Sequence, residues 1–342
     1  MLVPVMYRFS PGFILLFVAT VLFSANIASA QSASCPASEL GMDVVLPNGK
    51  TVEGLTAQNL IGQTKHDKVA IESLTFDTSP RRILLVLDMG HDLQADARRA
   101  QLEMASYLVN GARETDSIAL LTARGALRKV GFDKGRDAVA AAIAELRDKK
   151  AAPSTDTGIL DAVMEGISWF KNPAPGDAII AMASQIEENK SARYVEVAAA
   201  LAKNHIRLFS IALGPILVGT YFSPVDPFSR HNSWGFAMND ENLSALTWNS
   251  GGYMLFEETQ DPWKEYKLTD AHLQDLLEEA ARMYVAIATF YRVSIRVPPA
   301  LRHREGWKLD LTEEIRKKVP HAYVVYPRLL DPCTAETAAH AE

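Results

Sequence analysis

The run Arg82-Ile-Leu-Leu-Val-Leu-Asp88 is the stretch of sequence that decides the fold. Its five apolar residues predict a strand that is buried on both faces, as in a parallel sheet covered by helices on each side. The strand ends at an aspartate, Asp88. Because ligands of open α/β sheets bind beyond the carboxyl ends of the strands, Asp88 is the first candidate for a functional residue.

Strands and helices alternate regularly after this run. An amphipathic pattern predicts a helix over 93–113, and Gly251-Gly252 predicts the end of another helix. The alternation indicates βαβ units, and hence an α/β fold with a doubly wound, mostly parallel, Rossmann-like sheet. Further strands are predicted at 117–122, 178–182, 206–212 and 253–256, and further helices at 137–146, 158–170, 194–203 and 243–249.

Both flanks of this region have the character of β structure. The turn sequence Pro47-Asn48-Gly49-Lys50 separates two expected strands on the amino-terminal side. We expect the two flanking portions to join in one small satellite sheet. The strands predicted there lie at 43–46, 51–53, 69–76, 307–311 and 322–326, with a β run over 284–297 that follows a helix at 270–282.

The amino terminus predicts export. Arg8 precedes an apolar run from Phe13 to Phe23, and Ala28-Ser29-Ala30 has the form of a signal-peptidase site. We expect a periplasmic or extracellular protein that is not inserted in the membrane after cleavage. The expected units are a signal peptide at 1–30, a β segment at 31–80, an α/β domain at 81–260, a helix with a β segment at 261–333 and a flexible tail at 334–342.

Charge and cysteine content limit the partners and the covalent structure. Loss of Arg8 changes the formal charge from −6 to −7, and the chain has no dense basic run, so we expect no nucleic-acid partner. The only two cysteines, Cys35 and Cys333, lie at opposite ends of the mature chain. In an oxidising compartment they are expected to form a disulfide that closes nearly the whole protein; two unpaired thiols are the alternative.

The buried strand that ends at Asp88 is one of several distinctive stretches. The others are Val44–Thr56, Thr157–Ala162, Ile206–Gly214 and Leu246–Tyr253. Together these stretches resemble the von Willebrand factor A (VWFA) domain, and more specifically the bacterial VWFA-related group common in acidobacterial proteomes. The resemblance implies a VWFA-like domain over 81–260 with a metal-ion-dependent adhesion site, where a D-x-S-x-S motif, a threonine and a later aspartate hold Mg²⁺ or a similar ion.

This sequence departs from that motif. Asp88 and Thr157 match, but Gly90 replaces the first serine, Asp92 the second, and Ser184 lies where the family has its later aspartate run. The resemblance therefore implies a degenerate site with Asp88, Asp92 and Thr157 as the remaining ligands. We expect no bound cofactor; an Mg²⁺ ion held with the help of water is the alternative.

A long insertion, 215–239, is the second candidate for recognition. It follows a predicted strand, and its aromatic residues favour either a binding surface or packing over the satellite sheet. The candidate residues are Tyr221, Phe228, His231, Trp234 and Phe236.

The expected function is that of an exported, non-enzymatic protein that binds a protein partner. Motifs such as G-x-S-x-G, H-E-x-x-H and C-x-x-C are absent from the sequence. One alternative is a structural subunit of an envelope assembly that does not use the metal site. Another is a hydrolase that uses Asp88 and Asp92 as paired carboxylates.

Overall fold

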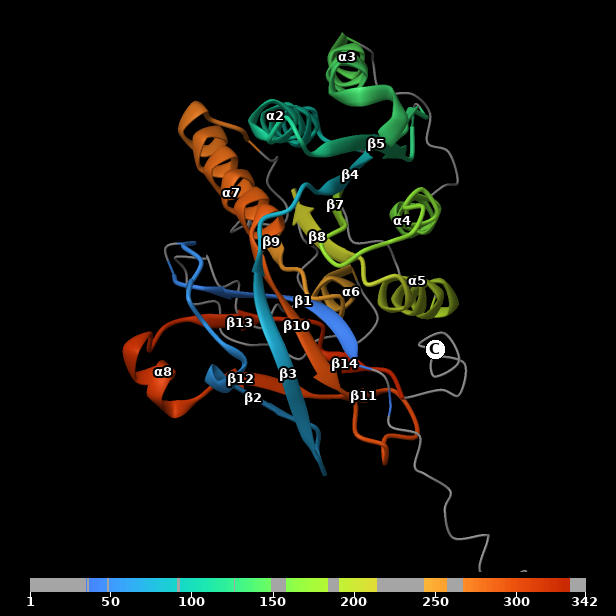
Figure 1. Cartoon of the computed structure of the whole chain (residues 1–342). Coiled ribbons are helices and arrows are strands. Elements are labelled where there is room, and N and C mark those ends of the chain that lie inside the picture. The colour runs from blue at the N-terminus through green and yellow to red at the C-terminus, as the bar shows by residue number, and fades with distance from the viewer. Residues whose placement is uncertain are drawn as a thin grey trace, which may run out of the picture.

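A computed structural model describes residues 35, 37–47, 49–90, 93–125, 127–148, 158–183, 191–213, 243–256 and 267–332. Within these residues the chain forms two sheets of six strands each, one mostly parallel and one antiparallel, and a two-stranded ribbon of β11 (Glu305–Gly306) and β14 (Leu329–Leu330). The two large sheets lie in separate layers (Figure 1).

The mostly parallel sheet is built from the predicted βαβ units. Its order is β6-β5-β4-β7-β8-β9, and only the edge strand β6 runs antiparallel to its neighbour. The strand of this sheet that comes first along the chain, β4, thus lies in the middle of the sheet, as in a doubly wound fold. The bounds are β4 (Arg82–Asp88), β5 (Ser117–Ala123), β6 (Lys129–Val130), β7 (Ala178–Ala183), β8 (Arg207–Ala212) and β9 (Met254–Phe256).

Helices cover both faces of this sheet, so its strands are apolar on both sides. In β4, Leu85 and Leu87 belong to the core under α2, α3 and α7, whereas Leu84 and Val86 belong to the core under α4, α5 and α6. All four are fully buried. The helices are α2 (Ala95–Gly111), α3 (Gly135–Asp148), α4 (Ile159–Ile167), α5 (Ser191–Lys203), α6 (Leu243–Asn249) and α7 (Asp270–Ala288).

The antiparallel sheet does combine the two flanking β portions, but it is not the small satellite that the sequence predicted. In the described part of the chain it has six strands in the order β12-β2-β3-β10-β1-β13, and its edge strands β12 and β13 also contact each other, so the sheet approaches a closed barrel. Its bounds are β1 (Ser38–Val45), β2 (Leu60–Gln63), β3 (Lys68–Asp77), β10 (Phe290–Arg296), β12 (Lys308–Leu311) and β13 (Tyr323–Val325).

Two further predictions for the flanks were wrong. The expected strand at 51–53 is only a single bridge between Val45 and Thr51. The expected β run at 284–297 is divided, because α7 continues to Ala288 before β10 begins. Short elements that the sequence pattern missed are β2, β6, β11, β14, α8 (Glu313–Lys318), η1 (Ala57–Asn59) and η2 (Phe132–Lys134). Among the described residues, no helix has both the length and the apolar character that crossing a membrane requires.

A buried arginine on the parallel sheet connects the two layers. Arg207, the first residue of β8, donates hydrogen bonds to the Asp43 carboxylate on β1, to the Gly251 carbonyl (3.1 Å) and to the Ala286 carbonyl (3.4 Å). Both Asp43 and Arg207 are almost fully buried. The amino edge of the parallel sheet is therefore covered by the antiparallel sheet.

A second arginine repeats this arrangement at the start of β4. Arg81 donates to the Asp77 carboxylate (3.1 Å) and to the Ile287 carbonyl (3.1 Å), and its guanidinium carbon lies 4.4 Å from the centre of the Phe290 ring. These side chains form what we call the interlayer cluster, namely Asp43, Asp77, Arg81, Arg207 and Phe290.

Candidate functional site

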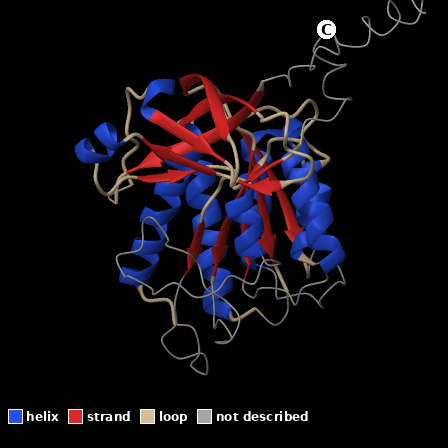
Figure 2. Cartoon of the chain, turned by 90° about the horizontal axis from the view of Figure 1, so that it is seen from below, coloured by secondary structure: helices blue, strands red, loops and turns tan. Residues whose placement is uncertain are grey.

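The carboxyl edge of the parallel sheet faces away from the antiparallel sheet (Figure 2). Strands β4, β5, β7 and β8 pair in parallel and end near one another, with Asp88 opposite Ala123, and Ala183 opposite Ala212. Because β5 lies on one side of β4 and β7 on the other, the order of the strands reverses at β4. Ligands of doubly wound sheets bind at such a switch point, so Asp88 occupies the position predicted from the sequence.

The Asp88 carboxylate is bound by an arginine. Its Oδ1 accepts hydrogen bonds from Arg124 Nε (2.9 Å) and from the Gly90 backbone N–H (3.1 Å), and its Oδ2 accepts one from Arg124 Nη2. The Asp88 side chain is 2% exposed and that of Arg124 is 16% exposed. This is a bidentate, charge-assisted pair in a largely dry environment, which is the strong form of the interaction.

The backbone aims Arg124 at Asp88. Arg124 follows β5 and has a φ of 47°, which non-glycine residues rarely adopt, and Gly125 has a φ of 70°. A Cβ atom at Gly125 would lie 1.9 Å from the Met89 carbonyl oxygen, so only glycine fits there. The Met89 N–H also donates to the Ala123 carbonyl (2.9 Å). The segments after β4 and β5 are thus packed directly against each other.

Arg124 was not predicted as a site residue, although the sequence contains a signal for it. The strand predicted at 117–122 is next to the strand that ends at Asp88, and an arginine followed by glycine stands directly after it. Side chains that follow adjacent parallel strands meet at one edge of the sheet, so this arginine was a candidate partner for Asp88.

Most of the other predicted site residues lie outside the described residues. Gly90 is described: it contributes its backbone N–H to Asp88 and has no side-chain oxygen. Cys35 is buried, but Cys333 is not among the described residues, so the disulfide between them stays a prediction. The expected flexible tail and signal peptide also lie outside the described residues. So do the remaining candidates, which are Asp92, Thr157, Ser184, Tyr221, Phe228, His231, Trp234 and Phe236.

The described residues at this edge do not fit a divalent metal ion. Mg²⁺ and similar ions bind through oxygen lone pairs, and both Asp88 oxygens already accept hydrogen bonds from the Arg124 guanidinium. Gly90 offers a donor where the adhesion-site motif has a hydroxyl ligand. Within the described ranges, no group of three or more His, Cys, Asp and Glu side chains could hold a metal ion.

A second arginine–aspartate pair connects the helices at the same edge. Arg193, in the first turn of α5, donates from Nε to Asp161 in the first turn of α4 (2.6 Å) and from Nη1 to Glu196 (2.7 Å). The Arg193 and Asp161 side chains are 39% and 38% exposed. Asp161 therefore connects two helices through Arg193.

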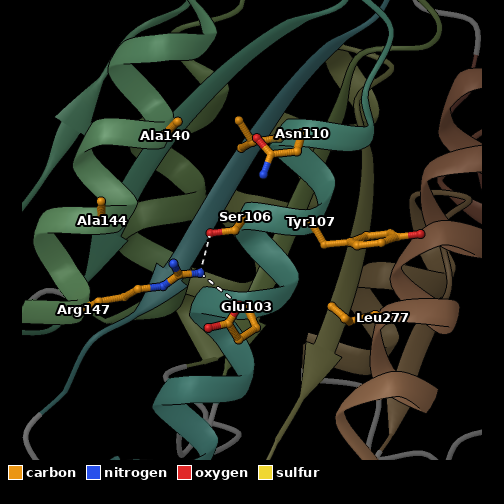
Figure 3. A pocket seen from close by; sticks show the side chains of 9 residues that line it. Glu103, Ser106, Tyr107, Asn110, Ala140, Ala144, Arg147 and Leu277 are labelled. Carbon is orange, nitrogen blue, oxygen red and sulfur yellow. Dashed lines mark hydrogen bonds and ion pairs between the residues drawn. The ribbon is translucent and has the colours of Figure 1, made fainter. Parts of the chain in front are cut away.

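A groove on the helical side is separate from this edge. It lies between α2 and α3, with Leu277 of α7 at its border, and Arg147 spans it with hydrogen bonds to Glu103 (3.0 Å) and Ser106 (2.9 Å) (Figure 3). The groove shares no residue with the pair at Asp88, and none of the predicted site residues lines it.

Comparison with known proteins finds similarity to solved structures but none to protein families or curated sequences. No protein-family model matches the sequence, and no curated protein matches it significantly. The solved structures that resemble this chain include a von Willebrand factor type A protein and a protein with a metal-ion-dependent adhesion site.

Three solved structures illustrate the similarity. An aerotolerance-related membrane protein from Bacteroides fragilis is 15% identical and covers 59% of this chain and 99% of its own, with a TM-score of 0.38. A von Willebrand factor type A protein from Catenulispora acidiphila is 10% identical over 88% and 74%, with a TM-score of 0.40. Proximal thread matrix protein 1 from the mussel byssus, with a zinc-occupied metal-ion-dependent adhesion site, is 13% identical over 65% and 50%, with a TM-score of 0.42. The strand order described above, rather than these matches, carries the fold assignment.

Proposed function

We propose that this chain is an exported, non-enzymatic interaction protein that binds a protein partner at the carboxyl edge of its parallel sheet. The observation that carries the proposal is the bidentate pair between Asp88 and Arg124. It places a charged, preorganised pair at the switch point of a doubly wound sheet, where ligands of this architecture bind.

The same observation argues against the hydrolase alternative. A general base needs a lone pair directed at the proton that it removes. The Asp88 carboxylate is buried and accepts hydrogen bonds from the Gly90 N–H and from a guanidinium that stays protonated at any physiological pH. Asp88 is therefore better suited to fixing the geometry of the edge than to accepting a proton from a substrate.

The aromatic insertion supports a protein partner as the ligand. It starts directly after β8, whose carboxyl end lies at this edge. Aromatic side chains are favoured anchors of protein interfaces. We include Tyr221, Phe228, His231, Trp234 and Phe236 in the proposed recognition surface. Export, with a periplasmic or extracellular location, belongs to the proposal on the strength of the amino-terminal sequence alone.

Two charge reversals at opposite ends of the molecule test the proposal. Arg193→Glu changes the carboxyl edge, and Arg296→Glu changes the exposed face of β10 in the antiparallel sheet; both side chains are half-exposed and form surface ion pairs. The mature protein, Gln31 to Glu342, is immobilised, exported proteins of the same organism are captured and identified, and the affinity of a purified candidate is measured by calorimetry for each variant.

We expect Arg193→Glu to weaken binding at least tenfold and Arg296→Glu to leave the affinity unchanged. The reverse pattern would overturn the proposal and favour the structural subunit, which binds through the antiparallel sheet. Hydrolytic activity of the purified protein that disappears in Asp88→Asn would favour the hydrolase instead.

A further inference from the structure

We infer that the Arg124 guanidinium takes the place of a divalent cation at the carboxyl edge, so that this edge works without metal. The inference deepens the proposed function because it concerns the same site, yet its test needs no partner. It starts from the disagreement between the adhesion-site motif, which implies a metal, and the residues that surround Asp88.

Charge and geometry form the first step. A buried carboxylate needs a compensating positive charge, and Arg124 supplies one through two parallel N–H donors, one to each oxygen of Asp88. Arginine cannot lose its proton in a protein, so this charge is permanent. A divalent ion would have to displace the guanidinium from both oxygens of Asp88.

The second step concerns the backbone. Arg124 is one of three described non-glycine residues with a positive φ, and it lies directly at the site. Such conformations persist only where the surrounding structure imposes them. Here the close contact of Gly125 with the Met89 carbonyl fixes the turn. The position of the guanidinium is therefore built into the main chain and does not depend on a side-chain rotamer alone.

The third step is the donor set at Gly90. The adhesion-site motif places a hydroxyl ligand at this position, whereas here the Gly90 N–H donates to Asp88 Oδ1. That N–H occupies one lone pair of the carboxylate by hydrogen bonding, and it cannot coordinate a cation. The edge thus presents a neutral ion pair, not a metal with an open coordination position, and a partner is not captured through a carboxylate bound to metal.

A metal titration combined with a double-mutant cycle tests the inference. The purified mature chain is stripped with chelator, and its thermal unfolding and binding heat are followed while Mg²⁺, Mn²⁺ and Ca²⁺ are added to millimolar levels. The variants are Asp88→Asn, Arg124→Gln and the double substitution, with Arg124→Lys retaining the charge but not the bidentate geometry.

We expect no saturable heat and no shift of the wild-type melting temperature with any of the ions. We also expect at least tenfold coupling between Asp88 and Arg124 in the unfolding equilibrium constant, and a melting temperature for Arg124→Lys below that of the wild type. A saturable metal-dependent rise of the wild-type melting temperature that is lost in Asp88→Asn would overturn the inference, as would additive effects of the two substitutions.

If the single variants do not fold, the wild-type titration still decides the question, because it needs no substitution. Failure of the proposed function gives a different result. In that case Arg193→Glu would bind the partner as tightly as the wild type does, while the metal titration of the wild type would still show no response.

Discussion

At the scale of single residues, the site depends on a turn that only glycine can complete. Gly125 combines a φ of 70° with the close approach of the Met89 carbonyl, and it directly follows the arginine that binds Asp88. Positive φ alone costs a residue with a Cβ roughly 1–2 kcal/mol. The contact with Met89 adds a backbone clash that a side-chain rearrangement cannot relieve.

Gly125→Ala is therefore expected to lower the free energy of unfolding by about 2–4 kcal/mol. Gly54→Ala is the matched control, because Gly54 has a φ of 77° but nothing lies within 4 Å of the place that its Cβ atom would take. It should cost only about 1 kcal/mol, from the backbone conformation. Chemical denaturation of the three proteins measures both values; equal losses would mean that the contact between the two turns does not matter.

Sequence analysis predicted Asp88 as a site residue, whereas Arg124 was indicated only by its place after the neighbouring strand and was not predicted. A buried strand that ends in aspartate points to the carboxyl edge on general grounds, and the structure places Asp88 there. Arg124 was missed because the candidate ligands were taken from the adhesion-site motif, which expects oxygen ligands and a metal. The left-handed conformation of Arg124 and the distance between two loops are properties of the folded chain that no local pattern contains.

At the scale of secondary-structure elements, helix α4 packs against strand β4 through a glycine, Gly166. A Cβ atom at Gly166 would lie 2.2 Å from Leu84 Cδ2, and Leu84 is fully buried in the centre of the sheet. The missing side chain at Gly166 thus allows the helix to approach the strand that carries Asp88. Close packing of this kind leaves little room for an added methyl group.

We expect Gly166→Ala to destabilise the protein by about 1–2 kcal/mol, since overpacking outweighs the gain in helix propensity. Gly111→Ala, at the end of α2, is the control, because nothing lies within 4 Å of its Cβ position. It is expected to be neutral or to stabilise by up to about 1 kcal/mol. Thermal unfolding compares the two variants. Equal stabilisation by both would show that α4 can move away from β4 without cost.

The elements of the α/β region could be predicted well, because their hydrophobic periodicity agrees with their final environment. The helix α7 was cut short in the prediction, since Tyr284-Val-Ala-Ile-Ala288 is also typical of a strand. Its buried positions Leu276, Ala280, Met283 and Ile287 continue the helical spacing, and this pattern decides the structure. Short strands such as β6 depend on pairing with distant residues, so local patterns do not reveal them.

At the scale of the whole molecule, the interlayer cluster connects the two sheets through buried charges. Asp43 lies between the layers, and burial raises its pKa to about 6, because desolvation outweighs the attraction of the Arg207 guanidinium. A carboxyl group whose pKa is higher in the folded state binds its proton more tightly when folded. Its contribution to stability is therefore present below pH 3.8 and is lost as the pH rises through 6.

The difference in unfolding free energy between the wild type and Asp43→Asn is thus expected to fall by up to about 3 kcal/mol from pH 4 to pH 7. Asp310→Asn is the opposite control: hydrogen bonds from Arg316, among others, hold the pKa of Asp310 below its usual value, so its contribution is lost as the pH falls. Urea denaturation at each pH measures both. A difference for Asp43 that is independent of pH would contradict the expected shift.

The position of β1 between β10 and β13 has a consequence for how the protein is made. Ser38 pairs with Ile295, and Asp43 pairs with Val325, so β1, the first strand of the described residues, can pair only after strands near the carboxyl end have been synthesised. At about 5–20 residues per second, this interval is on the order of 10–50 s. During that time the edges of β1 and β3 have no partner from the carboxyl-terminal portion, and unpaired strand edges attract other chains. We therefore expect that shielding of these strand edges until the last hundred residues arrive reduces aggregation of the nascent chain.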